Sequence, residues 1–392
     1  MTLKTAKQAT IDWLSILQFG LGCLGIVLAW MLALAQFVAS LGELPRLDLL
    51  SALIPGMGIF IVGLLLFPST LLGLSRILGR TPAAFKLRGK LFGFAILIFP
   101  LLLALGNLAQ DAGRIWPVAL LYLSNAILLV AWLLWLALRQ LPAGSVQRIW
   151  GAFASGLAAT PLLAFALEAA GGFILVTLLS IYAGFNPDLG RAIELLSTNP
   201  SADRLVQLLA PVLNDPVILF AGLFSLGFAG PLIEELLKPL GVYLLLRRNL
   251  SEAQGFALGA LCGGGYALFE NLTLITIPEA MAVGALGRFG VSAMHIFTAA
   301  LSGWALARAV KQKRALPLLG ILALNIFIHG LWNSLVLLFS AGAVAQASGT
   351  GLVPPAFIVV SPLALAFIAM GCVALLRKFN LAFARSQAPK TT

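Results

Sequence analysis

Long runs of hydrophobic residues, separated by short polar segments, make up most of this chain. Ten of these runs reach the roughly 20 residues that a helix needs to cross the hydrocarbon core of a bilayer. They begin near residues 13, 50, 91, 116, 155, 216, 253, 289, 315 and 355. Because the runs are continuous and do not alternate between apolar and polar positions as barrel strands do, they predict helices. The pattern therefore predicts an all-α, polytopic transmembrane helical bundle of about ten spans.

The composition agrees with a lipid environment. Hydrophobic residues make up 60% of the chain and charged residues only 10%, which excludes a soluble globule because too few polar side chains remain to cover its surface. The net charge of +11 would favour nucleic acid in a soluble protein, but here the basic residues lie in short loops, where they orient helices instead. The sequence thus predicts a multi-pass integral protein of the cell membrane that binds the lipid bilayer and no nucleic acid.

Lysine and arginine are distributed unevenly between alternate connections. Nineteen of them lie in one set of segments, which includes both termini. The alternate segments hold Arg46, Arg114, Arg191, Arg204 and Arg288. Since cytoplasmic loops are enriched in positive charge, both termini are predicted to face the cytoplasm. A cleaved signal peptide is left open for the first run, because Lys4 and Lys7 precede it and Ala33 and Ala35 have the spacing of a cleavage site.

The longest polar connection, residues 186–215, separates two unlike halves of the chain. Before it the spans carry almost nothing ionisable except Glu168, whereas after it nearly every span has polar or charged residues in mid-run. Within the connection, leucine and isoleucine positions predict a short amphipathic helix on the membrane surface: Leu189, Ile193, Leu195 and Leu196. The predicted division is 1–185, an N-terminal five-helix region of unknown role; 186–215, an extracytoplasmic loop; 216–340, a four-helix core; and 341–392, the last transmembrane helix with a basic cytoplasmic tail.

Six ionisable residues lie inside the later apolar runs. They are Glu234, Glu235, Lys238, Glu270, His295 and His329. Because each such group costs about 3 kcal/mol to insert into the membrane, each needs a structural partner or a function. Helical spacing puts Glu234 and Lys238 on one face, and it joins Asn325, His329 and Asn333 in one polar stripe. These faces are expected to point into the bundle.

Several of these residues share a predicted depth. Glu234 lies 13 residues from Arg247, His295 lies 13 from Arg308, and His329 lies 15 from Arg314. At 1.5 Å per residue, each is about 20 Å from the cytoplasmic edge of its helix. Glu270 comes out somewhat nearer the outer face. We therefore expect four consecutive helices to deliver their polar groups to one layer in the outer half of the bilayer.

Proline and glycine modify the helices that carry this layer. Pro231 and Pro239 are expected to break or kink the sixth predicted helix on either side of the glutamate pair. Residues 263–265 are three consecutive glycines, which let the seventh helix approach a neighbour closely and bring Tyr266 and Glu270 against it.

At these residues the sequence resembles the PrsW family of membrane proteases, relatives of the CAAX-prenyl endopeptidases and bacteriocin-processing enzymes. Four motifs match in order between residues 228 and 334. They are the glutamate pair and lysine, Glu234, Glu235 and Lys238; the aromatic-x-x-x-Glu-Asn motif, Tyr266, Glu270 and Asn271; the third-motif histidine, His295; and the His-x-x-x-Asn motif, His329 and Asn333. Tyr266 replaces the usual phenylalanine.

The resemblance implies an intramembrane endopeptidase in which a glutamate acts on water. We assign Glu234 as the general base, with His329 and Asn333 donating hydrogen bonds to the oxyanion that forms on the scissile carbonyl. His295 would orient the water or protonate the leaving amine, while Glu235 and Lys238 would form a structural ion pair. The implied substrates are membrane-anchored proteins cut near the extracytoplasmic side, with an anti-sigma factor as one candidate.

The residues also leave other mechanisms and functions open. They require no cofactor, but two histidines and a carboxylate on separate helices, namely Glu234, His295 and His329, could hold zinc with an open position for water. A proton-coupled transporter could use the same residues as a relay, although no internal repeat is apparent. A noncatalytic membrane scaffold with a polar core is the third alternative.

Overall fold

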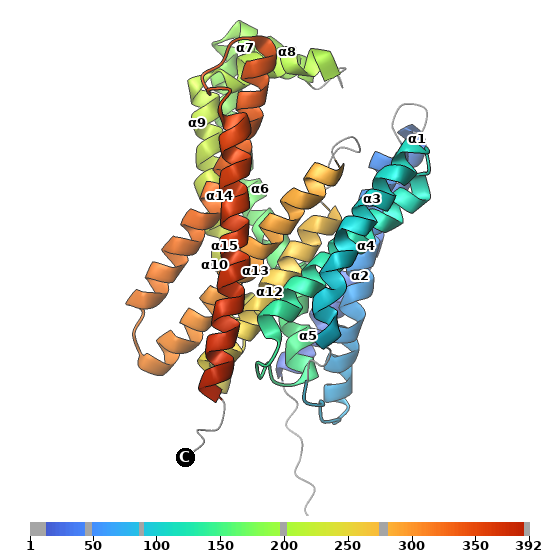
Figure 1. Cartoon of the computed structure of the whole chain (residues 1–392), viewed down its shortest axis with the longest axis vertical. Helices are drawn as coiled ribbons and strands as arrows, with labels where there is room; N and C mark the ends of the chain where they lie inside the picture. The colour runs from blue at the N-terminus through green and yellow to red at the C-terminus, as the bar shows by residue number, and fades with distance from the viewer. Residues whose placement is uncertain (1–12, 44–48, 86–89, 197–201, 274–280, 388–392) are drawn as a thin grey trace, which may run out of the picture. The chain divides into compact units, whose positions relative to one another are not determined.

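A computed structural model describes residues 13–43, 49–85, 90–196, 202–273 and 281–387 of the chain. Within these residues the regular structure is helical, and the β pairing is an isolated bridge between Ala84 and Ser145 (Figure 1). The all-α, polytopic fold predicted from the hydrophobic runs is confirmed. The continuous apolar runs explain it, because backbone groups that meet no water must bond to each other within a helix.

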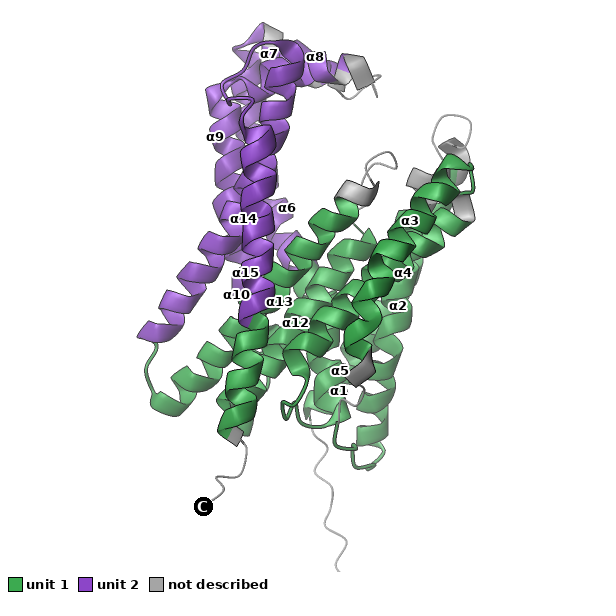
Figure 2. Ribbon diagram, in the orientation of Figure 1, with its two compact units in different colours: residues 1–161, 238–315, 376–392 green, residues 162–237, 316–375 purple. Residues whose placement is uncertain are grey.

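The helices form two compact units that are interleaved along the chain (Figure 2). Unit 1 consists of Met1–Pro161, Lys238–Ala315 and Leu376–Thr392, and unit 2 of Leu162–Leu237 and Leu316–Leu375. Each unit is therefore built from segments that are distant in sequence. The linear four-part division predicted above stays a prediction.

Unit 1 holds the N-terminal helices together with several elements from the second half of the chain. Its elements are α1 (Trp13–Glu43), α2 (Leu49–Ile77), the 3₁₀ segment η1 (Lys90–Leu97), α3 (Ile98–Asp111), α4 (Ile115–Leu138), α5 (Val146–Ala154), the π turn η2 (Ser155–Ala159), α11 (Leu240–Tyr243), η4 (Leu246–Arg248), α12 (Glu252–Thr273), α13 (Met281–Gln312) and the end of α15 (Phe357–Gln387).

Unit 2 holds most of α6 (Thr160–Gly184) and the elements that follow it up to the glutamate pair. These are α7 (Pro187–Leu196), α8 (Ala202–Leu213), α9 (Pro216–Phe224), the π turn η3 (Ser225–Ala229) and α10 (Gly230–Leu237). It also holds α14 (Leu316–Ser348) and the first part of α15.

Nine helical segments in the described part of the chain are long and apolar enough to cross a membrane. They correspond to nine of the ten predicted spans. The remaining predicted span coincides with α12, a helix of 22 residues that is rich in glycine and contains Glu252 and Glu270. Nearly all of its side chains are buried in the structure, so α12 meets protein on every side and does not need a lipid-compatible surface.

The α12–α13 contact in unit 1 depends on glycine. Gly255, Gly259 and Gly263 follow each other at intervals of four residues and form one stripe along α12. A methyl group added at these positions would lie 2.3, 2.2 and 2.4 Å, respectively, from the carbonyl oxygens of residues 303, 299 and 295 on α13. The two backbones therefore approach as closely as in other small-residue helix pairs in membranes. This confirms the predicted close approach of the glycine-rich helix and fixes the backbone that carries His295.

The basic segments within unit 1 meet at one end of that unit. The backbone N–H of Phe85 donates to the Gly144 carbonyl at 3.0 Å, and the Asn380 side chain donates to the Ala137 carbonyl at 2.8 Å. At the start of α12, Glu252 accepts a hydrogen bond from Trp304 Nε1 at 2.8 Å. These contacts agree with alternate loops sharing one side, while the cytoplasmic orientation of both termini stays a prediction.

The connection between α6 and α9 contains the predicted amphipathic segment as helix α7, followed by α8. Leu189 is buried, so at least this part of the apolar face packs against protein. The side chains of Ile193 and Leu196 lie outside those described, and attachment of α7 to a membrane surface stays a prediction.

Substitution of Gly259 by valine should destabilise unit 1 strongly, because the new side chain would meet the Ala299 carbonyl, which belongs to the backbone of α13 and cannot rotate away. Overpacking of this kind costs about 1–3 kcal/mol or more. Thermal unfolding of the detergent-purified protein would measure it. Gly287→Val on α13 is the matched control, since no atom lies within 4 Å of its added carbon. Equal melting temperatures for the two variants would contradict the close packing described here.

Candidate functional site

The helix that carries the glutamate pair begins at an irregular turn. In η3 the N–H of Gly230 donates to the Ser225 carbonyl, five residues back, and the next residue, Pro231, has no N–H. The Leu226 carbonyl has therefore lost its α-helical donor, and Asn333 Nδ2 donates to it at 3.0 Å. The predicted break at Pro231 thus takes the form of a π turn, a feature that is frequent at functional sites. At the other end, α10 stops at Leu237, just before Pro239.

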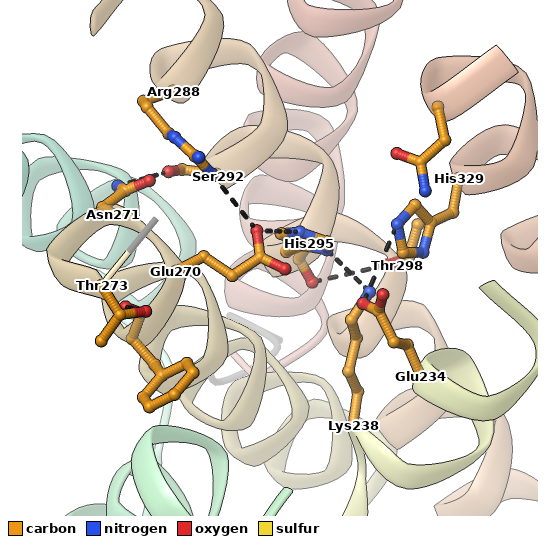
Figure 3. Close-up of polar contacts among 12 residues, drawn as sticks. Glu234, Lys238, Glu270, Asn271, Thr273, Arg288, Ser292, His295, Thr298 and His329 are labelled. Carbon is orange, nitrogen blue, oxygen red and sulfur yellow. Dashed lines mark hydrogen bonds and ion pairs between the residues drawn. The ribbon is translucent and has the colours of Figure 1, made fainter. Parts of the chain in front are cut away.

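Within unit 2, α10 and α14 bring Glu234, Glu235 and His329 together. Glu235 Oε1 lies 3.1 Å from His329 Nδ1. Glu234 Oε2 lies 3.8 Å from His329 Nε2, and Figure 3 shows Glu234 and His329. Glu235 is fully buried and His329 is 2% exposed. Gly330 makes this approach feasible, because a methyl group there would meet the Gly227 carbonyl oxygen at 1.9 Å.

This geometry assigns different positions to the two glutamates. The Glu235 carboxylate accepts the Nδ1–H of His329, which fixes the ring orientation and directs Nε2 toward Glu234. The distance of 3.8 Å between Glu234 and Nε2 is too long for a direct hydrogen bond. It leaves a carboxylate oxygen and an imidazole nitrogen facing each other across a gap that a small ligand can bridge.

Within unit 1, Lys238, His295 and Glu270 form a chain of contacts. Lys238 Nζ lies 2.7 Å from His295 Nδ1, and His295 Nε2 lies 3.1 Å from Glu270 Oε2 (Figure 3). An ammonium can only donate, so a charged Lys238 makes Nδ1 the acceptor and leaves the ring proton on Nε2, which donates to the carboxylate. The chain thus stabilises one tautomer of a neutral imidazole between a cation and an anion.

Two further contacts hold this chain. Tyr266 packs edge-on against the His295 ring, with centroids 5.2 Å apart, and Lys238 Nζ lies 5.1 Å from the centre of the same tyrosine ring. Asn271, the neighbour of Glu270 in its motif, donates through Nδ2 to Ser292 Oγ at 2.9 Å and ties α12 to α13. All the residues of the second and third motifs therefore lie in one connected set.

The sequence-predicted site residues are thus brought together in two sets, one in each unit. The structure gives His329 as a partner of Glu235 and His295 as a partner of Lys238, while the predicted Glu235–Lys238 ion pair stays a prediction. Asn333 is one turn from His329, as expected, and one of its amide hydrogens is used on the Leu226 carbonyl. Its proposed role as an oxyanion donor would use the other.

Arg288 is a further member of the site that was not among the residues predicted from the sequence. Its guanidinium lies 3.6 Å from Glu270 Oε2, and both side chains are mostly buried. In the sequence it counted only as a basic residue of an outer segment. Its spacing was informative, however, because Arg288, Ser292 and His295 follow each other at i, i+4 and i+7 and so lie on one face of α13.

Comparison with known families decides which protein class this is. A family model described as PrsW family intramembrane metalloprotease matches residues 128–368, more than half of the chain and every residue of both sets. The chain belongs to this family. No curated protein and no solved structure matched the chain.

As a PrsW family member the protein is an enzyme, a multi-pass integral membrane protease that acts on membrane-anchored substrates. The resemblance noted in its four motifs is confirmed. The description as a metalloprotease also gives weight to the metal alternative, which the sequence alone neither required nor excluded.

The donors of unit 2 fit a metal ion. In metal sites a ligating histidine binds the metal through one ring nitrogen and usually donates the N–H of the other to a carboxylate, as His329 Nδ1 does to Glu235. Glu234 supplies a carboxylate oxygen on the side of that nitrogen. In unit 1, both nitrogens of His295 have partners, so ligation by His295 would require one of these contacts to be exchanged.

Replacing Asn333 by leucine should leave the Leu226 carbonyl without its side-chain donor and lower the stability of unit 2 by about 1–3 kcal/mol. The melting temperature of the purified protein measures this. Ser340→Ala on the same helix is the control, because Ser340 donates to the Val336 carbonyl of its own helix at an exposed position. A melting temperature as high for Asn333→Leu as for the control would show that the π turn does not need this residue.

Proposed function

We propose that this protein hydrolyses peptide bonds of membrane-anchored proteins near the extracytoplasmic side, with Glu234 as the carboxylate that acts on water. The observation that carries the proposal is the arrangement of His329 between two carboxylates in unit 2. A histidine placed only for packing would not need two buried anions, since each unpaired charge in the membrane is costly.

The two carboxylates are proposed to divide the work. Glu235, fully buried against His329 Nδ1, keeps the imidazole in position throughout the reaction. Glu234, 8% exposed, faces Nε2 across the 3.8 Å gap and takes the proton from the attacking water. With Nε2 also protonated, between the two carboxylates, His329 would then donate a hydrogen bond, together with Asn333, to the oxyanion on the former carbonyl.

His295 is proposed to serve the leaving group. Its tautomer is fixed by Lys238 on one nitrogen and by Glu270 on the other, an arrangement in which the ring can pass a proton without reorienting. His295 would protonate the amine as the peptide bond breaks or orient the water before attack. Lys238 supplies the positive charge that keeps this process from leaving an unpaired carboxylate in the membrane.

A metal ion is compatible with this assignment. The residues that would hold it are the three that the sequence offered for zinc, Glu234, His295 and His329, and zinc matches this set of nitrogen and carboxylate ligands. A bound zinc would lower the pKa of water and polarise the scissile carbonyl. The proposed setting is the cell membrane, with both termini in the cytoplasm, and an anti-sigma factor anchored by a single span is the client suggested by the motifs.

Glu234→Gln should reduce cleavage of a single-span reporter protein in proteoliposomes by 10²-fold or more, because general-base catalysis contributes about 10²–10⁴. Glu194→Gln on α7, outside both sets of residues, should retain the wild-type rate. Membrane proteomes of cells expressing wild type or Glu234→Ala would then identify the client as a protein that accumulates in full length. Cleavage by Glu234→Gln at the wild-type rate would rule out the proposed base, and a transporter would show no cleavage by either form.

Removal of divalent metal should test the metalloenzyme form of the proposal. We expect treatment with a strong zinc chelator to lower reporter cleavage more than tenfold, and added Zn²⁺ to restore it, because the ion is bound by few protein groups. Metal content by mass spectrometry should fall in parallel, and His329→Gln should reduce it without chelator. Full activity of demonstrably metal-free protein would instead establish a glutamate mechanism without metal.

A further inference from the structure

Unit 1 contains a small cavity that is lined in part by Arg288, the residue that pairs with Glu270. It lies among α3, α4, α12 and α13, and its polar lining consists of Tyr122, Asn125, Asn271 and Arg288. About 10 Å³ of it can be occupied by the centre of a water molecule, which is enough for one. The two residues from α4 precede the segment that matches the PrsW family, so the N-terminal helices supply part of this cavity.

Three of the lining residues each carry a buried polar atom that has no hydrogen-bond partner in the described part of the protein. They are Tyr122 Oη, Asn125 Oδ1 and Asn271 Oδ1, on side chains that are 7%, 3% and 0% exposed. Buried polar groups in folded proteins are nearly always satisfied, by protein or by ordered water. Three exceptions around one cavity point to a common ligand.

The chemistry of the lining selects this ligand. Two amide oxygens accept hydrogen bonds and the tyrosine hydroxyl can donate one, which matches a water molecule that donates twice and accepts once. A metal cation is disfavoured by the guanidinium of Arg288, and an anion is disfavoured by the two amide oxygens. An apolar ligand would leave all three atoms unsatisfied.

We propose that this cavity is a resident-water site that hydrates the Arg288–Glu270 pair and thereby positions Glu270 against His295. Arg288 lines the cavity and its guanidinium lies 3.6 Å from Glu270 Oε2, slightly beyond a direct hydrogen bond. The same carboxylate oxygen accepts from His295 Nε2. Arg288 therefore connects the water site to the chain of contacts formed by Glu270, His295 and Lys238. Tyr122 and Asn125, which hold the water, are positioning residues. The effect on catalysis rests on the proposed function, whereas the presence of water does not.

Melting temperatures of Tyr122→Phe, Asn125→Leu and the double variant in detergent test the presence of water. With a resident water, each single variant removes one of its hydrogen bonds, so each should melt about 2 °C lower or more. The double variant should lose less than the sum, because both residues act through one water. Leu120→Ala, which changes a side chain exposed on the same helix, sets the baseline.

A dry cavity predicts the opposite sign, because Phe and Leu would then delete unpartnered polar atoms and raise the melting temperature. Additive shifts, or higher melting temperatures for the single variants, would overturn the proposal. Density for a water among these side chains in a high-resolution structure of the wild type would support it directly, and a cavity without such density would overturn it.

Cleavage of the reporter separates this proposal from the proposed function. Asn125→Leu should lower kcat severalfold with little change in KM, and Asn125→Ser, which keeps a polar group and leaves room for a second water, should recover most of the loss. Unchanged kcat in Asn125→Leu would refute the positioning role even if water is present. If Glu234→Gln cleaves normally, the proposed function fails, while the melting temperatures still decide the water site.

Discussion

Burial of charge in a medium without water governs how this protein is built. A carboxylate or ammonium within the hydrocarbon region must be stabilised by protein groups, because lipid tails offer neither hydrogen bonds nor counter-charge. In unit 2 this makes Glu235 and His329 partners, and in unit 1 it links Lys238, His295 and Glu270. Breaking such a pair costs about 3–5 kcal/mol, so the same contacts that make catalysis feasible also hold the helices in register.

Close helix packing is what allows these pairs to form. A histidine or glutamate side chain reaches across a helix interface only if the backbones are near each other, and glycine provides this at Gly263 beside His295 and at Gly330 beside His329. Gly263 on α12 faces the His295 carbonyl on α13. Gly330 directly follows His329 on α14 and faces the Gly227 carbonyl. Chemistry and packing in this protein are therefore specified by neighbouring positions, a small residue for the approach and a polar residue for the contact.

The sequence predicted the helices and the family well, because hydropathy reports directly on membrane insertion and motif spacing on which residues share a face. It predicted partners less well. Arg288 looked like an ordinary loop residue, and the sequence did not single out Tyr122 and Asn125, because nothing in a linear pattern shows which helices become neighbours. The bond from Asn333 to Leu226 was also hidden, since it depends on a π turn that frees a carbonyl. The same holds for α12, which the sequence predicted as one more span. Other helices bury it in the structure, and this burial explains why it contains more polar residues than a lipid-facing span would.

Glu235 is proposed to act on catalysis through His329, and a double-mutant cycle on kcat tests this most directly. Purified wild type, Glu235→Gln, His329→Gln and the double variant would be compared on a single-span reporter in proteoliposomes, with folding checked by melting temperature. If Glu235 works by holding His329, the double variant should be no slower than His329→Gln alone. Losses that multiply in the double variant, or a wild-type rate in His329→Gln, would contradict the account.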